Sequence, residues 1–547
     1  MRLLDTTSLK LREFAEDKIP PYAILSHTWG APNEEVSFQD MQLDTTTLEK
    51  DRKYGYSKIV KTCRFALKGG LEYAWVDTCC IDKSSSAELT EAINSMFRWY
   101  EKAVICYVYL ADVKPQMHLE QGLKRCRWIT RGWTLQELIA PRECQLFDSE
   151  WKYRGRKTEL KEMLAKLTGV PASVLAKEMS PRDYSVAQRM SWAAMRTTTR
   201  TEDVAYCLMG LFGIHMPMIY GEGDMAFHRL QEEILKRSDD PTIFTGWEPP
   251  DGAPDILSIL APSPAPFKRS GNLVNPVGFR SSEFTLTNKG VKIVNAPVLW
   301  LREPPTLPRT YLLVLDGGTT KREMAGIYLR KVDGNLFCRI NKRIKVSSDL
   351  QQEGLRQRTV SEIYVADFCT FPITRSVILE SRKSAVQILG PDGFHIDNAT
   401  PQRVWDYTDS CFLGGAPDAP LVQWVQMQGI IRGQSVSLII LCDRRAENGC
   451  GTPALSVIEK CQSVKFYKYL NQKAWRQGKE LTWSEVKAVN AALLHHTEST
   501  EIPFKDAVLK ICVSVAKGMV STREGDIQMY QAKVDFKRGK RSSAKDK

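Results

Sequence analysis

Residues 22–150 alternate between strand-like and helix-like segments, and this alternation limits the fold more than any other feature of the sequence. The run Val104–Leu110 is almost continuously apolar, as expected of a central strand that is covered on both faces. Helices are predicted between the strands, and the order strand, helix, strand, helix indicates an open, mostly parallel α/β sheet. The segments predicted to form its strands are residues 22–26, 74–81, 104–110 and 144–147.

The chain of 547 residues is too long for one core, and its character changes along its length. Helical periodicity continues over residues 155–238, a stretch rich in Pro, Gly and Ser follows Asp239, and short strand-like runs come after it. The sequence therefore predicts an α/β domain at 1–150, a helical extension at 151–240, a connector at 241–275, a β-rich sandwich or barrel region at 276–530 and a basic disordered tail at 531–547.

The formal net charge is +12, and part of this excess lies at the end of the chain. A short basic tail is usually solvated, although it can also serve as a nuclear-import signal or contact an anionic surface. No nucleic-acid-binding motif accompanies the tail, so nucleic acid is not an expected partner. The cations of the tail are Lys537, Arg538, Lys540, Arg541, Lys545 and Lys547.

The sequence has no apolar stretch long enough for a signal peptide at its N-terminus and no run of eighteen apolar residues elsewhere. Its 14 cysteines lack the spacing of a small disulfide scaffold or of a zinc site. We therefore expect a cytoplasmic protein with reduced thiols, no membrane span and no bound metal, and a nuclear location if the basic tail acts as an import signal.

Three short motifs stand out in the first half of the chain. They are Leu25-Ser-His-Thr-Trp-Gly30, Trp75-Val-Asp-Thr-Cys-Cys-Ile-Asp82 and Arg131-Gly-Trp-Thr-Leu-Gln-Glu137. These motifs resemble the three signature blocks of fungal heterokaryon incompatibility (HET) domains in their usual order. The later segments Ala205–Gly213 and Tyr220–Gln231 are similar to the helical part that follows such domains, so the resemblance covers roughly residues 1–245.

The resemblance implies an effector of vegetative incompatibility, a form of fungal innate immunity. Such proteins induce programmed cell death after non-self recognition. Some members of the family carry a nucleotide-binding switch and a repeat array behind the HET domain, but this sequence contains neither the G-x-x-x-x-G-K-[ST] loop nor an internal repeat of 20–50 residues. A nucleotide-switch domain is therefore not expected, and the protein partner or regulator stays open.

The order of elements also resembles a TIR domain, which suggests a mechanism. The helix segment Trp133-Thr-Leu-Gln-Glu-Leu138 corresponds to the motif whose glutamate cleaves NAD between ribose and nicotinamide in catalytic TIR domains. By this resemblance Glu137 is the candidate catalytic residue of an NAD glycohydrolase. NAD would be its substrate, with no bound cofactor, and self-association is expected because TIR-like enzymes usually require it.

The chemistry of N-glycosidic cleavage fits these residue types. Breaking the bond builds positive charge on the ribose, and a nearby carboxylate stabilises that charge. Trp133 and Glu137 are four residues apart on a predicted helix and so share a face, where an indole can pack on the substrate. Other substrate-binding residues are expected in loops at the carboxyl ends of the strands. The candidates for substrate binding are Ser26, His27, Trp29, Gly30, Asp77 and Trp133.

Each candidate also has a structural interpretation. Glu137 can form a salt bridge with a neighbour such as Arg131 or Arg142, and Trp133 can be a core residue. The loop residues can serve as a packed turn (Trp29-Gly30), an exposed loop residue (His27) or a helix cap (Asp77).

Two further alternatives follow from the same segments. The HET domain can be a non-catalytic signalling module that triggers death through protein–protein assembly. A thiol-protease pair of His27 with Cys79 or Cys80 is weakly supported, because no third group is visible to orient it. The stretch Tyr220–Gly223 is predicted to be a turn at the start of a helix.

Overall fold

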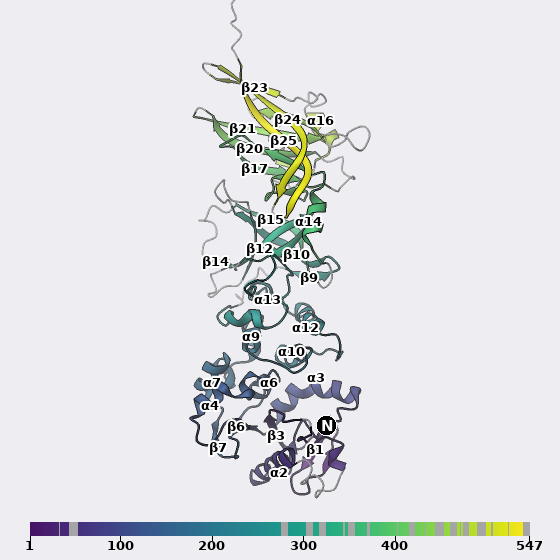
Figure 1. The fold of residues 1–547 in the computed structure, drawn as a ribbon, viewed down its shortest axis with the longest axis vertical. Helices are drawn as coiled ribbons and strands as arrows, with labels where there is room; N and C mark the ends of the chain where they lie inside the picture. Colours follow the sequence, from purple (N-terminus) through teal and green to yellow (C-terminus); the bar gives the residue numbers. More distant parts are fainter. Residues whose placement is uncertain are drawn as a thin grey trace, which may run out of the picture.

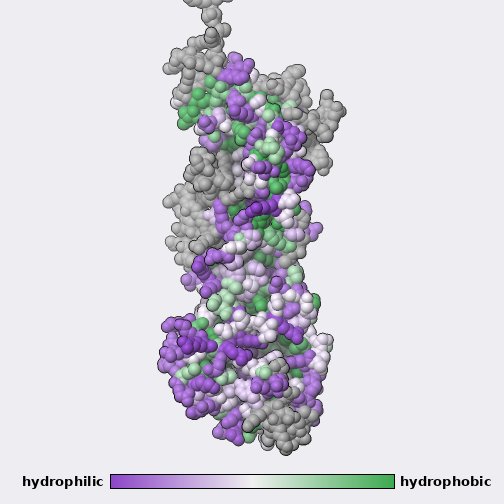
Figure 2. All heavy atoms as spheres, viewed as in Figure 1, coloured by the Kyte–Doolittle hydropathy of each residue, from purple (hydrophilic) through white to green (hydrophobic). Residues whose placement is uncertain are grey.

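A computed structural model shows an elongated molecule, with the N-terminal region at one end and a long β-hairpin at the other (Figure 1). Hydrophilic residues cover most of the visible face of the N-terminal region (Figure 2). The structure describes residues 1–31, 33–42, 53–274, 283–301, 310–316, 324–342, 345–347, 356–368, 372–401, 403–414, 422–431, 433–443, 453–459, 468–470, 472–473, 481–489, 499–504, 507–522 and 524–539.

The N-terminal region contains a seven-stranded sheet in the order β2-β1-β4-β3-β5-β6-β7. The four central strands, β4, β3, β5 and β6, are parallel, whereas β1, β2 and β7 pair antiparallel outside them. The predicted α/β sheet is therefore confirmed, but "mostly parallel" was wrong, since strands joined by short connections extend it on both sides. The strands are β1 (Arg2–Asp5), β2 (Leu11–Glu13), β3 (Tyr22–His27), β4 (Tyr73–Trp75), β5 (Ile105–Tyr109), β6 (Cys144–Phe147) and β7 (Tyr153–Arg156).

Helices cover both faces of this sheet. Successive side chains of a strand point to opposite faces. Ser26 of β3 bonds to α6, whereas the next residue, His27, bonds to α2, so these two helices lie on opposite sides. The helices of the sheet domain are η1 (Glu16–Lys18), η2 (Asp40–Gln42), α2 (Lys53–Lys68), α3 (Ser86–Lys102), α4 (Leu119–Arg125), α5 (Arg127–Thr130) and α6 (Thr134–Ile139).

The strand predicted over residues 74–81 is shorter than expected, because β4 ends at Trp75. The N–H groups of Cys79 and Cys80 both donate to the carbonyl oxygen of Val76, at 3.3 and 2.9 Å, and turn the chain away from the sheet. The side chain of Ser85 then accepts the N–H of Glu88 and caps α3, and Ser85 with Glu88 has the spacing of a capping box in the sequence. Asp77 consequently lies on a turn beyond the strand.

A helical layer follows the sheet, as the periodicity of residues 155–238 predicted. Leu208 and Leu211 are buried, and so are Phe227, Leu230 and Ile234 on one face of the longest helix of this layer. The helices are α7 (Lys161–Thr168), α8 (Ala172–Leu175), η3 (Pro181–Asp183), α9 (Val186–Ala193), α10 (Asp203–Tyr206), α11 (Met209–Phe212), α12 (Met225–Leu235) and α13 (Thr242–Thr245).

The segment predicted to be a connector, residues 241–275, is packed into the protein within its described part, 241–274. Phe244 and Trp247 are buried, and their carbonyl oxygens accept hydrogen bonds from Arg339 at 2.8 and 2.7 Å. The guanidinium of Arg339 also lies 3.6 Å from the centroid of the Trp247 ring. A segment poor in regular structure is therefore part of the core where the two halves meet. Its short elements are β8 (Ile256–Leu257) and η4 (Ala265–Arg269).

A second contact joins the helical layer to the β-rich half. The carboxylate of Asp367 is fully buried and lies 2.7 Å from Nε2 of His228 on α12. Its other oxygen accepts a hydrogen bond from Ser258 Oγ at 2.8 Å. We refer to His228, Ser258 and Asp367 as the junction triad.

The β-rich half begins with a small closed barrel. The strands β12, β11, β10, β15 and β13 pair in that order, and β13 also pairs with β12, which closes the ring. The predicted β region is confirmed here as a barrel. The strands of this part are β9 (Phe284–Thr287), β10 (Gly290–Leu301), β11 (Thr310–Asp316), β12 (Met324–Asp333), β13 (Leu336–Ile340), β14 (Lys345–Ser347) and β15 (Arg356–Val365).

Beyond the barrel lie a six-stranded sheet, β18-β19-β16-β25-β24-β23, and a four-stranded sheet, β17-β20-β21-β22. The elements are α14 (Arg375–Arg382), β16 (Val386–Leu389), β17 (His395–Thr400), β18 (Trp405–Asp406), β19 (Cys411–Phe412), β20 (Gln423–Ile431), β21 (Gln434–Asp443), β22 (Ala454–Glu459), α16 (Trp483–Val489), β23 (Ser499–Phe504), β24 (Ala507–Thr522) and β25 (Gly525–Gly539).

The predicted basic tail at 531–547 began too early. Residues up to Gly539 pair with β24 along a continuous antiparallel ladder, because Val513 and Val534 and their neighbours alternate inward as in any half-buried strand. The remaining residues of that prediction, 540–547, lie outside the described residues.

A network of buried ion pairs fixes the barrel to the distal sheets. Arg330 lies 3.2 Å from a carboxylate oxygen of Asp406, 2.7 Å from one of Asp409 and 2.8 Å from one of Glu524. Arg382 pairs with the same two aspartates, and its Nε lies 2.6 Å from Asp409. We refer to these five residues as the barrel network.

The described cysteines are free thiols and all but Cys512 are buried, as the sequence predicted. In the described part of the chain, no helix combines the length and apolar character that crossing a membrane requires.

Candidate active site

The order of the central strands creates a place where the chain changes direction in the sheet. From β3 the chain moves to β4 on one side, and it then returns past β3 to form β5 on the other side. In open α/β sheets, ligands bind in the crevice outside the carboxyl ends of the strands at this switch point. The loops that border it here follow His27 of β3 and Tyr109 of β5.

Glu137 and Ser26 meet below this edge of the sheet. Ser26 Oγ donates a hydrogen bond to Glu137 Oε2 at 2.5 Å, and Trp128 Nε1 donates to Ser26 Oγ at 2.7 Å. Ser26 is fully buried, and Glu137 is only 7% exposed. The Trp128 hydrogen bond fixes the direction of the Ser26 hydroxyl, so the serine must present its proton to the carboxyl group.

Glu137 is held without a cationic partner. Burial raises the pKa of Glu137 to about 8, although the hydrogen bond from Ser26 and the charges of Arg131 and Arg196 act in the opposite direction. No salt bridge joins Glu137 to Arg131 or Arg142, and all three residues lie in the described part of the chain. Arg131 donates instead to Thr199 Oγ1 at 2.6 Å. The salt-bridge interpretation of Glu137 was therefore wrong.

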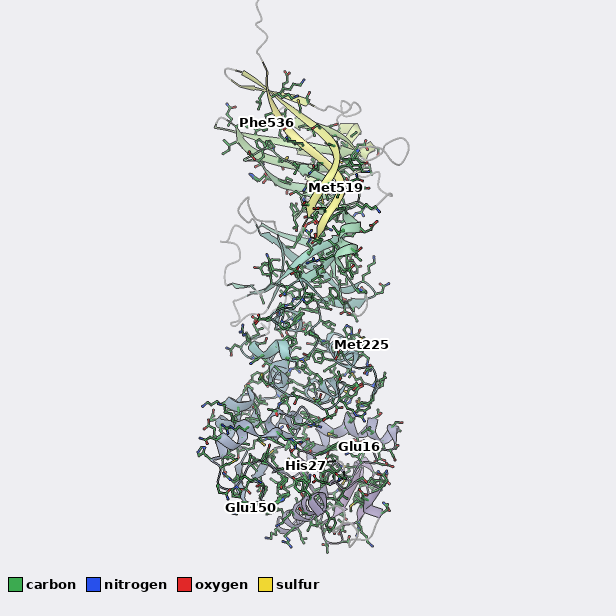
Figure 3. The ribbon with its side chains drawn as sticks, viewed as in Figure 1. Glu16, His27, Glu150, Met225, Met519 and Phe536 are labelled. Atoms are coloured by element: carbon green, nitrogen blue, oxygen red, sulfur yellow. The ribbon has the colours of Figure 1, made fainter. Side chains whose placement is uncertain are left out.

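His27, Asp77 and Trp29 form a second polar cluster on the other face of the sheet. His27 Nε2 lies 3.0 Å from Asp77 Oδ1, and Trp29 Nε1 donates to Asp77 Oδ2 at 2.8 Å. Lys58 of α2 lies behind them, with its Nζ 2.9 Å from His27 Nδ1, and it also pairs with Glu35. Figure 3 shows His27 within the N-terminal region.

The contacts of Lys58 and Asp77 with His27 determine which atoms donate and which accept these hydrogen bonds. An ammonium group only donates, so His27 Nδ1 must accept the hydrogen bond from Lys58, and Nε2 carries the proton that Asp77 accepts. Burial by itself would raise the pKa of Asp77, but the hydrogen bond and charge of His27, the charge of Lys83 and the hydrogen bond from Trp29 outweigh it and hold that pKa well below its usual range.

Trp29 and Gly30 lie on the rim of the edge. The Trp29 side chain is 41% exposed even though its indole nitrogen is fixed by Asp77. The Gly30 N–H donates to Glu35 Oε1 at 2.6 Å, and a Cβ at Gly30 would come within 2.8 Å of Glu34. The prediction of a packed turn is confirmed for Gly30, while the indole of Trp29 stays partly exposed.

Trp133 does not join Glu137. The Trp133 residue precedes α6, and its side chain hydrogen-bonds Asp203 of the helical layer, which also accepts from Tyr220 at 3.1 Å. Trp133 and Glu137, which were predicted to share a face, therefore contact different partners, Asp203 and Ser26. The reason is a short parallel bridge between Arg131 and Thr197, which brings the helical layer against the start of α6 and draws the indole toward it.

The structure thus divides the predicted site residues into three groups. Ser26 lies with Glu137 on one face of the sheet, His27, Trp29 and Asp77 lie together toward the other face with Gly30 beside them, and Trp133 lies at the contact with the helical layer. Both of the first two groups converge on the carboxyl end of β3.

Three residues of these clusters were not identified from the sequence. Lys58 precedes Thr62 by one helical turn, so it lies on the buried face of α2, where a lysine is unusual. Trp128 and Glu35 fall outside the three motifs and gave no signal of their own. The pairing of Ser26 with Trp128 depends on tertiary contacts over 102 residues of sequence.

The cysteines near His27 do not form a nucleophile. Cys79 Sγ donates to the Val76 carbonyl oxygen, and its interaction with Cys80, together with burial, raises the pKa of Cys79 well above its usual range. A buried thiol of this kind is not ionised, so the thiol-protease interpretation has no support. The segment Tyr220–Gly223 forms a turn before α12, as predicted. Among the described residues, no group of three or more His, Cys, Asp or Glu side chains could hold a metal ion.

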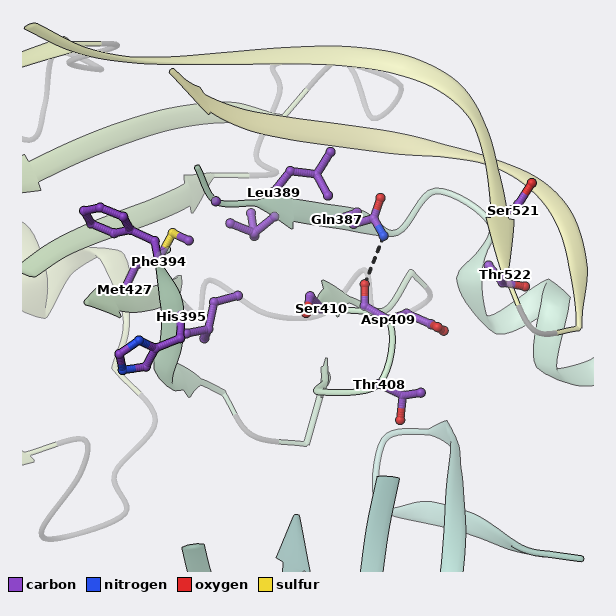
Figure 4. Close-up of a pocket in the computed structure, with 13 residues that line it drawn as sticks. Gln387, Leu389, Phe394, His395, Thr408, Asp409, Ser410, Met427, Ser521 and Thr522 are labelled. Atoms are coloured by element: carbon purple, nitrogen blue, oxygen red, sulfur yellow. Dashed lines mark hydrogen bonds between the residues drawn. The ribbon is translucent and has the colours of Figure 1, made fainter. Parts of the chain in front are cut away.

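A cavity of about 460 Å³ lies at the other end of the molecule, in the distal sheets (Figure 4). Gln387 Nε2 donates to the Asp409 carbonyl oxygen at 3.1 Å, and the Asp409 carboxylate is held by the barrel network. Gln387 and Asp409, two polar residues that line this cavity, are thus bonded to other groups of the protein. The cavity is also far from the motifs of the first half, and it has no acid that lacks a counter-charge.

Comparisons with known proteins concern the N-terminal region. Residues 22–123 match the family described as "Heterokaryon incompatibility protein (HET)". Over 234 residues the chain is 48% identical to the vegetative incompatibility protein HET-E-1 of Podospora anserina, a match that covers 41% of this chain and 17% of that protein. The chain therefore aligns with about a sixth of the length of that relative. No solved structure is significantly similar to the chain. The likeness to TIR domains stays a prediction.

Proposed function

We propose that this protein, whose residues 22–123 match the heterokaryon incompatibility family, is an effector of heterokaryon incompatibility that kills the cell by hydrolysing NAD at Glu137. One observation carries the enzymatic part of this proposal. A carboxyl group lies almost fully buried at the carboxyl end of the central strand β3, without a cationic partner, and its pKa is raised to about 8. Strongly perturbed acids beside a sheet crevice are typical of catalytic sites.

The proposed reaction converts NAD and water into nicotinamide, ADP-ribose and a proton. The bond between ribose C1′ and the pyridinium nitrogen breaks, and its electron pair returns to the ring, which leaves as neutral nicotinamide. Positive charge builds on the ribose as the bond lengthens, and water adds at C1′ and loses its proton. A carboxylate beside C1′ stabilises this charge, as carboxylates do in glycosidases.

The burial of Glu137 suits this role. A carboxylate in an apolar setting is costly when it stands alone, which is why the free site prefers the protonated form at neutral pH. The substrate carries a positive pyridinium ring, so its binding favours the ionised form of Glu137. The attraction between opposite charges is strong where water is excluded. The ionised carboxylate of Glu137, which burial disfavours in the free protein, is thus stabilised most by the positive charge of the transition state.

Ser26 is a positioning residue in this proposal. It holds one oxygen of Glu137 and is itself held by Trp128, so the carboxyl group cannot rotate freely. Its hydrogen bond also lowers the pKa of Glu137, against the larger effect of burial. In this proposal the cluster of His27, Asp77 and Trp29, at the same carboxyl end of β3, contacts the substrate through the exposed indole of Trp29.

The role in incompatibility is supported by the family match and by the name of the aligned Podospora anserina protein, a vegetative incompatibility protein. The aligned part is small on the side of that protein, so the trigger and the partners are not carried over. The β-rich half of this chain takes the position of regulator in our proposal, because it docks directly on the helical layer through the junction triad.

The experiment uses the full chain, purified at high concentration and incubated with NAD, with nicotinamide and ADP-ribose measured by chromatography. We expect the wild type to release both products and Glu137→Gln to lose on the order of a hundredfold or more in rate. The matched control is Glu150→Gln, because Glu150 is an exposed acid of the same region, paired only with Lys152 (Figure 3). Circular dichroism of each variant verifies that the fold is retained.

A second candidate function is a non-catalytic assembly module. It is favoured by the near-complete burial of Glu137 and its bond to Ser26, which also suit a purely structural polar centre. The same variants separate the two functions when they are expressed in fungal cells. If neither the wild type nor Glu137→Gln consumes NAD and both still kill, death follows from assembly and the enzymatic proposal is wrong.

A further inference from the structure

Trp29 is held in one orientation by groups from two other segments, the connection after β4 and the start of α5. Its indole nitrogen donates to Asp77, in the turn after β4, and its carbonyl oxygen accepts a hydrogen bond from Arg127 Nη2 at 3.1 Å. Lys83, which also follows β4, places its Nζ 3.7 Å from the centroid of the indole ring. An exposed aromatic side chain on a protein surface is rarely fixed at so many points, so its orientation is itself a feature to explain.

Arg127 connects both sides of the switch point. Its backbone N–H donates to Asp112 Oδ2 at 2.8 Å in the loop after β5, while its side chain reaches the loop after β3 at Trp29. The switch point between β3 and β5 is thus bordered by the arginine, the exposed indole of Trp29 and, on the β4 side, the lysine. The side chains of Arg127 and Lys83 are both exposed.

The acids around these two cations are already engaged. Asp77 accepts from His27 and Trp29, and Asp112 accepts the Arg127 N–H together with Cys126 Sγ. These carboxylates orient the cations and the ring but have oxygens committed to other donors. An anion at this rim therefore meets two positively charged side chains that both contact Trp29, Lys83 at its ring and Arg127 at its carbonyl oxygen.

We propose that Lys83, Arg127 and Trp29 form the subsite for the diphosphate part of a dinucleotide substrate. A guanidinium and an ammonium bind phosphate oxygens through charge-assisted hydrogen bonds, and the indole packs on the sugar or base next to them. This inference rests on the proposed function, because it assigns the part of NAD that does not react to this rim. It adds two residues, Lys83 and Arg127, that no motif of the sequence selected.

The spacing between this subsite and Glu137 fits one ligand. Trp29 follows Ser26 by three residues, so the two lie within about 10 Å of each other even in a fully extended chain. Trp128, which binds Ser26, directly follows Arg127. The buried Ser26, which holds Glu137, and the exposed rim at Trp29 thus lie close together at the carboxyl end of β3.

Binding of inorganic diphosphate and of ADP-ribose to the full chain, measured by isothermal titration calorimetry, tests this subsite without any turnover. We expect both probes to bind, and Lys83→Gln and Arg127→Gln each to weaken them roughly tenfold through the loss of one charge-assisted hydrogen bond. Added salt should weaken wild-type binding as well. The control is Arg125→Gln, which removes the same charge from an exposed position at the end of α4.

The outcomes separate this inference from the proposed function. If the probes bind in a manner that depends on Lys83 and Arg127 while NAD stays intact, the anion subsite is supported and the NAD hydrolase is not. If NAD is cleaved but Lys83→Gln and Arg127→Gln leave KM and probe binding unchanged, the subsite is overturned and Glu137 keeps its role. Equal weakening by Arg125→Gln would also overturn it, since binding would then follow net charge alone.

Discussion

The N-terminal region and the β-rich half both bury carboxyl groups, but they treat them differently. In the barrel network, Asp406, Asp409 and Glu524 each pair with at least one of two arginines, and these contacts lower the pKa of Asp406 and of Glu524 against the opposing effect of burial. In the N-terminal region, Glu137 has only a serine hydroxyl, and burial raises its pKa to about 8. Buried carboxylates that pair with arginines hold neighbouring elements in place. A buried carboxyl group without a cationic partner lowers the stability of the fold.

The difference indicates where function lies. A buried charge that is paired and hydrogen-bonded is a structural element, and its removal is costly because a partner is left behind. A buried acid without a partner is retained at a cost to the fold, which selection tolerates at a site that must act on a ligand. On this basis we propose that Glu137 is the functional carboxyl and that the β-rich half acts as scaffold and regulator.

The largest effect is expected in the barrel network. Arg382→Met leaves the fully buried Asp406 with half of its counter-charge, and we expect the free energy of unfolding of the β-rich half to fall by about 4 kcal/mol. Denaturant unfolding followed by tryptophan fluorescence measures this change. The control is Lys383→Met, because Lys383 is exposed and pairs only with the exposed Glu380, so its loss should cost less than about 0.5 kcal/mol. Equal effects of the two substitutions would contradict a stabilising network.

A somewhat smaller and opposite effect is expected at Glu137. Its pKa is about 8 in the folded protein and near the usual 4.5 in the unfolded chain, so between these values the folded state retains a proton that the unfolded chain has released. Stability is therefore greatest at low pH and falls as the pH rises toward 8. Glu137→Gln removes this loss, and its stability relative to the wild type should rise by roughly 3 kcal/mol between pH 5.5 and 8.5.

Urea unfolding of both proteins across this pH range provides the measurement. A constant difference between Glu137→Gln and the wild type would mean that Glu137 is ionised throughout and that its environment resembles the barrel network.

The smallest of the three effects concerns the junction triad. Burial lowers the pKa of His228, but Asp367 and Glu232 outweigh it and raise the pKa above its usual 6.5. The docking energy is therefore fully present at low pH and is lost as the pH rises through the raised pKa. His228→Gln should abolish this pH dependence and weaken docking by about 2 kcal/mol.

Hydrogen exchange of the Ile259 amide reports on this junction, since it donates to the Ala366 carbonyl oxygen at 3.2 Å across the contact. The control is His118→Gln, because His118 is exposed at the start of α4 in the N-terminal region. Exchange that is independent of pH in the wild type would show that the charge of His228 does not hold the two halves together.

The central strands were predictable because burial on both faces leaves an unmistakable apolar run. β3, β5 and β6 lie where the residues predicted them, and the start of α3 was marked by Ser85. β1, β2 and β7 were not found, since short outer strands have no such run. In the sequence, the barrel strands could be recognised only as strand-like runs. Closure of the barrel depends on the pairing of β12 with β13, which is a tertiary contact.

The residues of the candidate site could be named from the sequence, but their arrangement in space could not. The motifs contain Ser26 and Glu137, yet their hydrogen bond links positions 111 residues apart, and only the parallel order of the sheet brings them together. Trp133 was misplaced because helical spacing fixes which residues share a face and not which neighbours that face meets. The bridge between Arg131 and Thr197 decides this, and no local pattern predicts it.

The most direct test of the role of Glu137 is the pH dependence of kcat/KM for NAD cleavage in the wild type and in Ser26→Ala. Cleavage requires the ionised carboxylate, so kcat/KM should rise with pH through about 8 in the wild type. Ser26→Ala removes the hydrogen bond that lowers this pKa, so the rise should move to higher pH with the fold intact. A rise that stays at the same pH in Ser26→Ala, or a rate that does not depend on pH in this range, would contradict catalysis by Glu137.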